Sequence, residues 1–118
     1  MEKVLKEALL YDFYGELLTL HQKEIYEDFV LNDLSLGEIA EQRSISRQGV
    51  YDIVRRCRRQ LQGYEDRLHM VDRFVKIRKN IEEIDSLTAS LEESSSSETA
   101  SGQIRRIREL ADLILQEV

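Results

Sequence analysis

The sequence predicts an all-helical protein, and three observations lead to this prediction. The chain of 118 residues has no proline and only five glycines, the residues that most often interrupt helices and form tight turns. Apolar residues recur at intervals of three and four positions along most of the chain. Two patterns, Thr19 with Gln22 and Ser35 with Glu38, match the capping box that begins a helix. The length suits one domain that carries an appendage.

Four helices are expected in the N-terminal half. They cover roughly residues 4–17, residues 20–30, residues 35–41 and the segment that begins at residue 46. Leu20, Ile25 and Phe29 form the predicted inward face of the second helix, because they repeat at helical spacing. Ser46 is expected to cap the fourth helix with its hydroxyl group.

The fourth helix is expected to run well past Leu61. Its apolar residues are spaced 4-3-4-3-4-3-4 at Val50, Val54, Cys57, Leu61, Tyr64, Leu68, Val71 and Val75. The register slips near residues 74–78 and resumes through Leu91. A stripe sustained for more than three heptads is typical of a coiled-coil seam or a long docked helix.

The remaining chain predicts a linker, a last helix and self-association. The expected divisions are a helix-turn-helix domain over residues 1–62, a long helix for oligomerisation over 63–92, a serine-rich linker over 93–102, and a C-terminal helix over 103–118. The last helix is too short to be stable alone. Because a lone apolar stripe is rarely exposed in soluble monomers, we expect a homodimer through residues 64–118.

Charge is strongly segregated along the chain. The formal net charge is −6, but residues 1–42 carry −7, residues 43–80 carry +7 and residues 81–118 carry −6. Six arginines and one acid lie between Arg43 and Arg59. A basic block of this kind can attract a polyanion such as DNA. The alternatives are a solvated helix face, or a positive face that docks on the acidic ends of the same protein.

The basic block follows the spacing of a helix-turn-helix. A small residue at Ala40 would let two helices approach, Ile45 would fill the turn from beneath, and Val50 and Val54 would hold the second helix at a fixed angle. The turn commonly has glycine or asparagine where Ser44 stands. Because serine tolerates a left-handed conformation less well, we expect a strained turn.

The face that such a motif turns to DNA can be named from helical spacing. It consists of Ser46, Arg47, Gln48, Tyr51, Asp52, Arg55, Arg58 and Arg59. Arg47 and Gln48 have the side chains that pair with guanine and adenine in the major groove. Arg55 is expected to contact phosphate, whereas Arg56 is rotated away by about 100°. Tyr51 is a candidate for base stacking, with packing on the second helix as the alternative.

Other function classes find no support in the sequence. His21, His69 and Cys57 lack the spacing of metal ligands, and no phosphate-binding glycine loop or nucleophile motif is present. We therefore expect a protein that is not an enzyme and has no cofactor or metal. The lone cysteine and the absence of a signal peptide or of an apolar run of about 20 residues indicate a cytoplasmic protein without a membrane span.

Three runs of sequence carry a family resemblance. They are Leu18-Thr-Leu-His-Gln22, Leu34-Ser-Leu-Gly-Glu-Ile-Ala-Glu41 and Ile45-Ser-Arg-Gln-Gly-Val-Tyr-Asp52, closed by Leu61 and Tyr64-Glu65. Over roughly residues 5–70 the sequence resembles the YlxM-type (UPF0122) small helix-turn-helix proteins of Gram-positive bacteria, whose domain is similar to region 4 of sigma-70 factors.

The resemblance implies two functions. The first is DNA binding through the helix-turn-helix, in a regulatory protein with a role in the signal recognition particle pathway. The alternative is a non-enzymatic accessory protein that binds the signal recognition particle, as a ribonucleoprotein or through its protein components, without reading DNA sequence. Binding of RNA by this fold would rest on charge and shape, because an α-helix does not easily enter the narrow A-form major groove.

Overall fold

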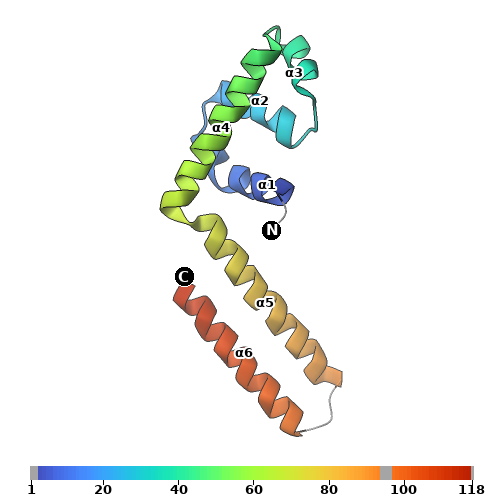
Figure 1. Ribbon diagram of the computed structural model, residues 1–118. Coiled ribbons are helices and arrows are strands. Elements are labelled where there is room, and N and C mark those ends of the chain that lie inside the picture. The colour runs from blue at the N-terminus through green and yellow to red at the C-terminus, as the bar shows by residue number, and fades with distance from the viewer. Residues whose placement is uncertain (1–2, 94–96, 118) are drawn as a thin grey trace. The chain divides into compact units, whose positions relative to one another are not determined.

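The computed structural model describes residues 3–93 and 97–117, and within these ranges the chain is almost entirely helical and contains no β-strand (Figure 1). The elements are α1 (Lys3–Tyr14), the 3-10 helix η1 (Gly15–Leu17), α2 (Leu20–Val30), α3 (Leu36–Arg43), α4 (Arg47–Leu68), α5 (Met70–Glu93) and α6 (Ser97–Glu117). The predicted all-helical fold is confirmed. The chain forms two compact units, Met1–Val71 and Asp72–Val118. No helix in the described ranges has the length and apolar content needed to cross a membrane.

Helix α4 is the central element of the first unit, because α1, α2 and α3 all pack against it (Figure 1). Val50, Val54, Cys57 and Leu61 on its inner side are each at most 2% exposed. Burial of such side chains stabilises a fold by roughly 1.5–3 kcal/mol each. The same burial raises the pKa of the Cys57 thiol to about 11, as expected for an unreactive core residue. This part of the predicted stripe therefore builds the core of its own unit.

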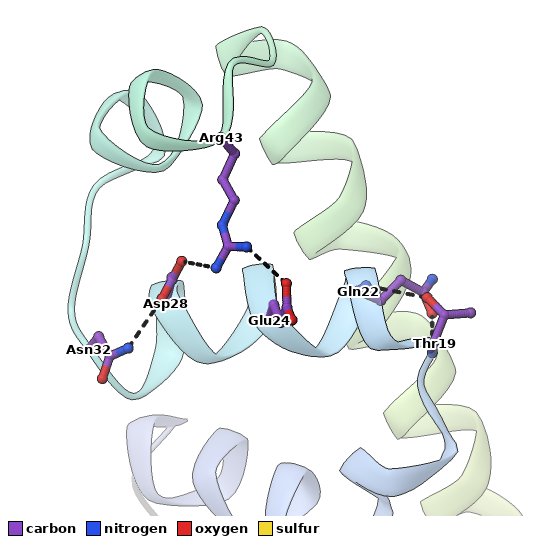
Figure 2. Close-up of polar contacts among 6 residues, drawn as sticks. All are labelled: Thr19, Gln22, Glu24, Asp28, Asn32 and Arg43. Carbon is purple, nitrogen blue, oxygen red and sulfur yellow. Dashed lines mark hydrogen bonds and ion pairs between the residues drawn. The ribbon is translucent and has the colours of Figure 1, made fainter.

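The helix starts are set by the side chains that the sequence indicates. Thr19 Oγ1 accepts a hydrogen bond from the Gln22 amide at 3.2 Å, and the Gln22 side chain accepts one from the Thr19 amide at 3.1 Å (Figure 2). Ser35 and Glu38 form the second capping box in the same way. The prediction that Leu20 faces the core is wrong. Its side chain is 72% exposed, because it lies in the first turn of α2, before the helix reaches the core.

The turn between α3 and α4 contains the left-handed residue that the sequence predicts. Ser44 ends α3 with φ 55° and ψ 41°, and its amide donates to the carbonyl oxygen of Ala40. The amide of Ile45 also donates to Ala40, at 3.1 Å. For a residue with a Cβ atom this conformation costs roughly 1–2 kcal/mol. The structure therefore confirms the left-handed turn at a position that would suit glycine.

The fourth helix passes Leu61 as expected, but the apolar stripe from Val50 to Val75 is divided between two helices. Although α4 does run past Leu61, it ends at Leu68, and His69 takes a left-handed conformation with φ 56° before α5 begins. The first two backbone amides of α5 donate hydrogen bonds to side chains of α1 and α4. The Glu65 carboxylate accepts from the Val71 amide at 2.9 Å, and the Tyr14 hydroxyl accepts from the Met70 amide at 3.1 Å.

The same two side chains also bond to each other. The Tyr14 hydroxyl donates to Glu65 Oε1 at 2.6 Å, and both residues are buried. Desolvation of the phenol, together with this hydrogen bond, raises the pKa of Tyr14. Because the segment after residue 62 is tied to α1 in this way, the first unit extends to Val71 and ends later than the expected boundary between residues 62 and 63.

The second unit is a pair of antiparallel helices, α5 and α6, that lie side by side (Figure 1). The Arg106 guanidinium donates to both carboxylate oxygens of Glu83, at 2.9 and 3.2 Å. The side-chain amide of Gln103 donates to the Ser90 hydroxyl oxygen at 2.7 Å. These contacts join α6 to α5 across the unit.

The expected linker over residues 93–102 is wrong for residues 97–102, which form the first turns of α6. Glu98 in the first turn favours this start, since a negative charge complements the partial positive charge of a helix N-terminus. Glu93 belongs to α5. Residues 94–96, the first three of four consecutive serines, lie outside the described residues.

Replacing Tyr14 with phenylalanine should destabilise the first unit. Tyr14→Phe removes a buried hydroxyl that donates to Glu65 and accepts from Met70, which should lower the free energy of unfolding by about 1–3 kcal/mol. Urea unfolding followed by circular dichroism measures the change. Tyr51→Phe, on an exposed tyrosine, is the matched control and should stay within about 0.5 kcal/mol of the wild type. Equal losses in both variants would contradict the role of the Tyr14 hydroxyl.

Replacing Ser44 with glycine should stabilise the first unit. Ser44→Gly relieves a left-handed conformation and should raise the free energy of unfolding by about 0.5–1 kcal/mol after the greater flexibility of unfolded glycine is included. Glu41→Gly, at an exposed position inside α3, should lower it by about 1 kcal/mol. The same urea experiment compares the two variants, and a loss of stability in Ser44→Gly would show that the serine side chain is needed in the turn.

Candidate nucleic-acid interface

Helices α3 and α4 have the packing of a helix-turn-helix. The two helices pack against each other, Ala40 of α3 is 9% exposed, and Val50 and Val54 are buried on the inner side of α4. The Ser46 hydroxyl accepts from the Gly49 amide at 2.9 Å and so fixes the first turn of α4. Ala40, Val50 and Val54 are therefore buried as expected for such a contact, and Ile45 in the turn is half-buried.

A guanidinium group fastens α3 to α2. Arg43 at the end of α3 donates from its two terminal nitrogens to Glu24 and Asp28, at 2.9 Å each (Figure 2). The hydrogen bond to Asp28 is the main cause that raises the pKa of Arg43, so its charge is used within the fold. Sequence reasoning counted Arg43 with the basic block and missed this role. The signal was present, because Glu24 and Asp28 are spaced i and i+4 on one face of a helix.

Arg58 also has a structural role, although the sequence placed it in the DNA-binding face. Its Nε atom lies 2.8 Å from a carboxylate oxygen of Glu7 in α1. Its guanidinium carbon lies 5.3 Å from the centre of the Phe29 ring in α2. A cation over an aromatic ring is attracted by the ring quadrupole. Arg58 thus holds α1 and α2 against α4.

The other predicted site residues lie on the exposed surface of α4 and at its start. They are Ser46, Arg47, Gln48, Tyr51, Asp52, Arg55 and Arg59. The side-chain amide of Gln48 donates to the Asp52 carboxylate at 3.1 Å, so the one acid in this set orients the glutamine side chain. Within residues 3–93 and 97–117, Arg47, Arg55 and Arg59 form no ion pair.

Arg47, Tyr51, Arg55 and Arg59 follow one another at intervals of four residues. Residues four apart share a face of an α-helix and drift slowly around it, so these side chains form one stripe. We call it the α4 stripe. The chain has more acidic than basic side chains, 23 against 17, and yet the three arginines of the α4 stripe have no acidic partner among the described residues. Such a surface is suited to an anion from outside the protein.

The α4 stripe borders two hollows, of which the second is mainly apolar. One, of about 520 Å³, is lined by Leu36, Arg47, Gln48 and Tyr51. The next, of about 280 Å³, is lined by Phe29, Leu36, Tyr51, Val54, Arg55, Arg58 and Arg59. Tyr51 lines both and is 46% exposed, so its ring can contact a ligand while it borders Phe29. Arginine side chains thus line the same hollows as the flat ring of Tyr51. Arginines suit phosphates, and an aromatic ring suits the faces of bases.

Comparison with known proteins supports this architecture. Residues 1–101 match the model of the UPF0122 family, described as YlxM / p13-like helix-turn-helix proteins. A UPF0122 protein of Acetivibrio thermocellus is 42% identical over 116 residues, which cover 98% of this chain and 99% of that protein. A UPF0122 protein of Caldanaerobacter subterraneus is 53% identical over 77 residues, 65% of this chain and 66% of the relative.

A third relative extends the likeness to another genus. It is a UPF0122 protein of Geobacillus kaustophilus, 43% identical over 84 residues that cover 71% of this chain and 76% of the relative. The family model spans the whole first unit, including the turn at Ser44 and the α4 stripe, and continues into the second unit. The chain therefore belongs to the UPF0122 family of YlxM / p13-like helix-turn-helix proteins.

Proposed function

We propose that this protein binds DNA through α4 and that it does not act as an enzyme. The observation that carries the proposal is the α4 stripe, whose arginines have no acidic partner among the described residues on the outer face of a helix-turn-helix. In this motif the start of the second helix enters the major groove. Arg47 and Gln48 would then meet base edges, while Arg55 and Arg59 would contact phosphates.

We infer a regulatory role in the cytoplasm for this activity. Its connection with the signal recognition particle pathway is supported by the resemblance to YlxM-type proteins described above. The apolar hollow of about 280 Å³ beside Tyr51 favours a second candidate, an accessory protein that binds the signal recognition particle or its components without reading DNA sequence. The two differ in salt dependence. DNA binding releases counterions and weakens steeply with salt, whereas docking through an apolar surface does not.

We also propose that the protein is a homodimer through its second unit. Among the described side chains of α5 and α6 that follow Val71, only Leu110 is buried. Ile81, Ile104, Leu113 and Leu115 are 43–73% exposed. Two helices alone cannot enclose a core, and a second copy that packs on these residues would form a four-helix arrangement. A symmetric dimer would present two copies of the helix-turn-helix to DNA half-sites.

Replacing Arg55 with alanine should weaken DNA binding for all sequences. Arg55→Ala removes a cation of the α4 stripe, so the slope of log affinity against log salt should become less steep by about 0.9, the value for one phosphate. Fluorescence anisotropy of labelled duplexes over a series of KCl concentrations measures this slope. Arg56→Ala is the matched control, because Arg56 is exposed but rotated from Arg55 by about 100°. An equal effect of both substitutions would argue against a specific face.

Replacing Arg47 or Gln48 with alanine should change which sequence is preferred. A base contact contributes roughly 1–3 kcal/mol of discrimination, so the loss should be confined to individual base positions. Selection from a randomised duplex library, compared between each variant and the wild type, measures the preference. If neither these substitutions nor Tyr51→Ala and Arg55→Ala affect nucleic-acid binding, the accessory function becomes the better proposal.

Charging the exposed apolar side chains of α6 should produce monomers. Ile104→Glu combined with Leu115→Glu places two carboxylates on one side of α6, on the proposed dimer surface, where burial of an unpaired charge is strongly unfavourable. Sedimentation equilibrium at concentrations on the order of tens of micromolar, where an interface of standard size holds, should show a dimeric wild type and a monomeric variant. Arg105→Glu, which changes the net charge by the same amount at an exposed position rotated by about 100° from Ile104, should leave the dimer intact. A monomeric wild type would overturn the proposal.

A further inference from the structure

A third hollow continues the two that border the α4 stripe. It has a volume of about 320 Å³ and is lined by Lys3, Lys6, Glu7, Leu10, Tyr26, Arg58, Arg59 and Gln62. The first two hollows share Leu36 and Tyr51, and the second and third share Arg58 and Arg59. The three hollows therefore form one furrow along α4, which begins beside the helix-turn-helix and ends between α4 and the start of α1. We call it the α4 furrow.

The end of the α4 furrow beside α1 is strongly basic. Four cationic side chains and one carboxylate line it, and the carboxylate of Glu7 is already paired with Arg58. Lys3, Lys6 and Arg59 are exposed and form no ion pair with any residue in the described ranges. Lys3 and Lys6 lie one helical turn apart on α1, so both ammonium groups can face the same ligand.

The floor of this end adds no compensating negative charge. Tyr26 is 1% exposed, and burial raises the pKa of its phenol to about 12, so the group is neutral at physiological pH. Leu10 is 6% exposed and supplies the apolar part of the floor. Cationic groups above a floor of low polarity are less screened by water than isolated surface lysines are. An anionic ligand in the α4 furrow would therefore be attracted most strongly to this end.

We propose that the α1 end of the α4 furrow, formed by Lys3, Lys6 and Arg59, binds a backbone phosphate of the nucleic acid whose bases are met near Arg47. This inference rests on the proposed function and extends its binding site onto α1, where the sequence indicated no site. Its ligand chemistry is a phosphate group, and the source that we infer is the nucleic-acid backbone.

The length of α4 supports that source. Twelve residues separate Arg47 from Arg59, and at a rise of about 1.5 Å per residue they span roughly 18 Å. The major groove of B-form DNA is only about 12 Å wide. A helix whose first turn contacts bases therefore has its residues near position 59 beside the sugar-phosphate backbone that borders the groove. Arg59 lines both the second and the third hollow and so connects the two parts of the site.

The test compares the salt dependence of duplex binding in two double variants. Lys3→Gln with Lys6→Gln should make the slope of log affinity against log salt less steep by about 0.9 for each phosphate that is no longer neutralised, up to about 1.8, without changing the preferred sequence. Lys76→Gln with Arg78→Gln is the control of equal charge, because both cations are already paired within α5, with Asp72 and Glu82. This control should keep the wild-type slope.

Each outcome decides between the inference and the proposed function. If both double variants have the wild-type slope while Arg55→Ala still reduces it, the α1 site is overturned and DNA binding by α4 stands. If the wild type binds no duplex, DNA binding itself fails, and a titration with tripolyphosphate followed by amide NMR decides the site. Shifts at Lys6, Arg59 and Gln62 that disappear in the lysine variant would support a site for free phosphates, and no shift would overturn it.

Discussion

The buried carboxylate of Glu65 is the interaction on which the arrangement of the first unit depends. It is 7% exposed, and it accepts hydrogen bonds from the Tyr14 hydroxyl and the Val71 amide. A buried carboxylate without such partners would cost several kcal/mol, so α1 must dock on α4 for the unit to be stable. Docked in this way, α1 supplies Glu7 to Arg58 and brings Lys3 and Lys6 to the end of the α4 furrow. One structural contact thus also determines the extent of the candidate binding surface.

Five of the six arginines between Arg43 and Arg59 divide into two groups according to the side of the helices on which they lie. Arg43 and Arg58 face other helices and pair with Glu24, Asp28 and Glu7, all from the acidic first third of the chain. For these two, the alternative that the positive face docks on the protein's own acids is correct. The arginines of the α4 stripe have no such partner within the described residues, so the acids used internally leave the outer face of α4 positive. This explains how a chain with a net charge of −6 can present a basic surface.

The features predicted from the sequence are those with causes that lie within a few residues. A capping box, a small residue at Ala40 and the left-handed turn at Ser44 depend on neighbours along the chain, and all three are present. The break at His69 was missed because its causes are Glu65 and Tyr14, and these two are separated by 51 positions. The apolar spacing of three and four residues continues on both sides of His69, so the spacing alone does not reveal that one left-handed residue changes the direction of the chain there. The role of Arg58 was missed for the same reason, since Glu7 comes from another helix.

Helix α4 serves as core and as candidate interface at once, and helical geometry keeps these two functions separate. Residues at positions 50, 54, 57 and 61 form the buried side, while the α4 stripe at positions 47, 51, 55 and 59 winds along the exposed side. An exposed side chain such as Arg55 contributes little to stability, whereas truncation of a neighbour such as Val54 would leave a cavity. Selection on the outer face can therefore alter what the protein binds without altering its fold. Arg58 is the exception, because it joins the helices and also lines the furrow.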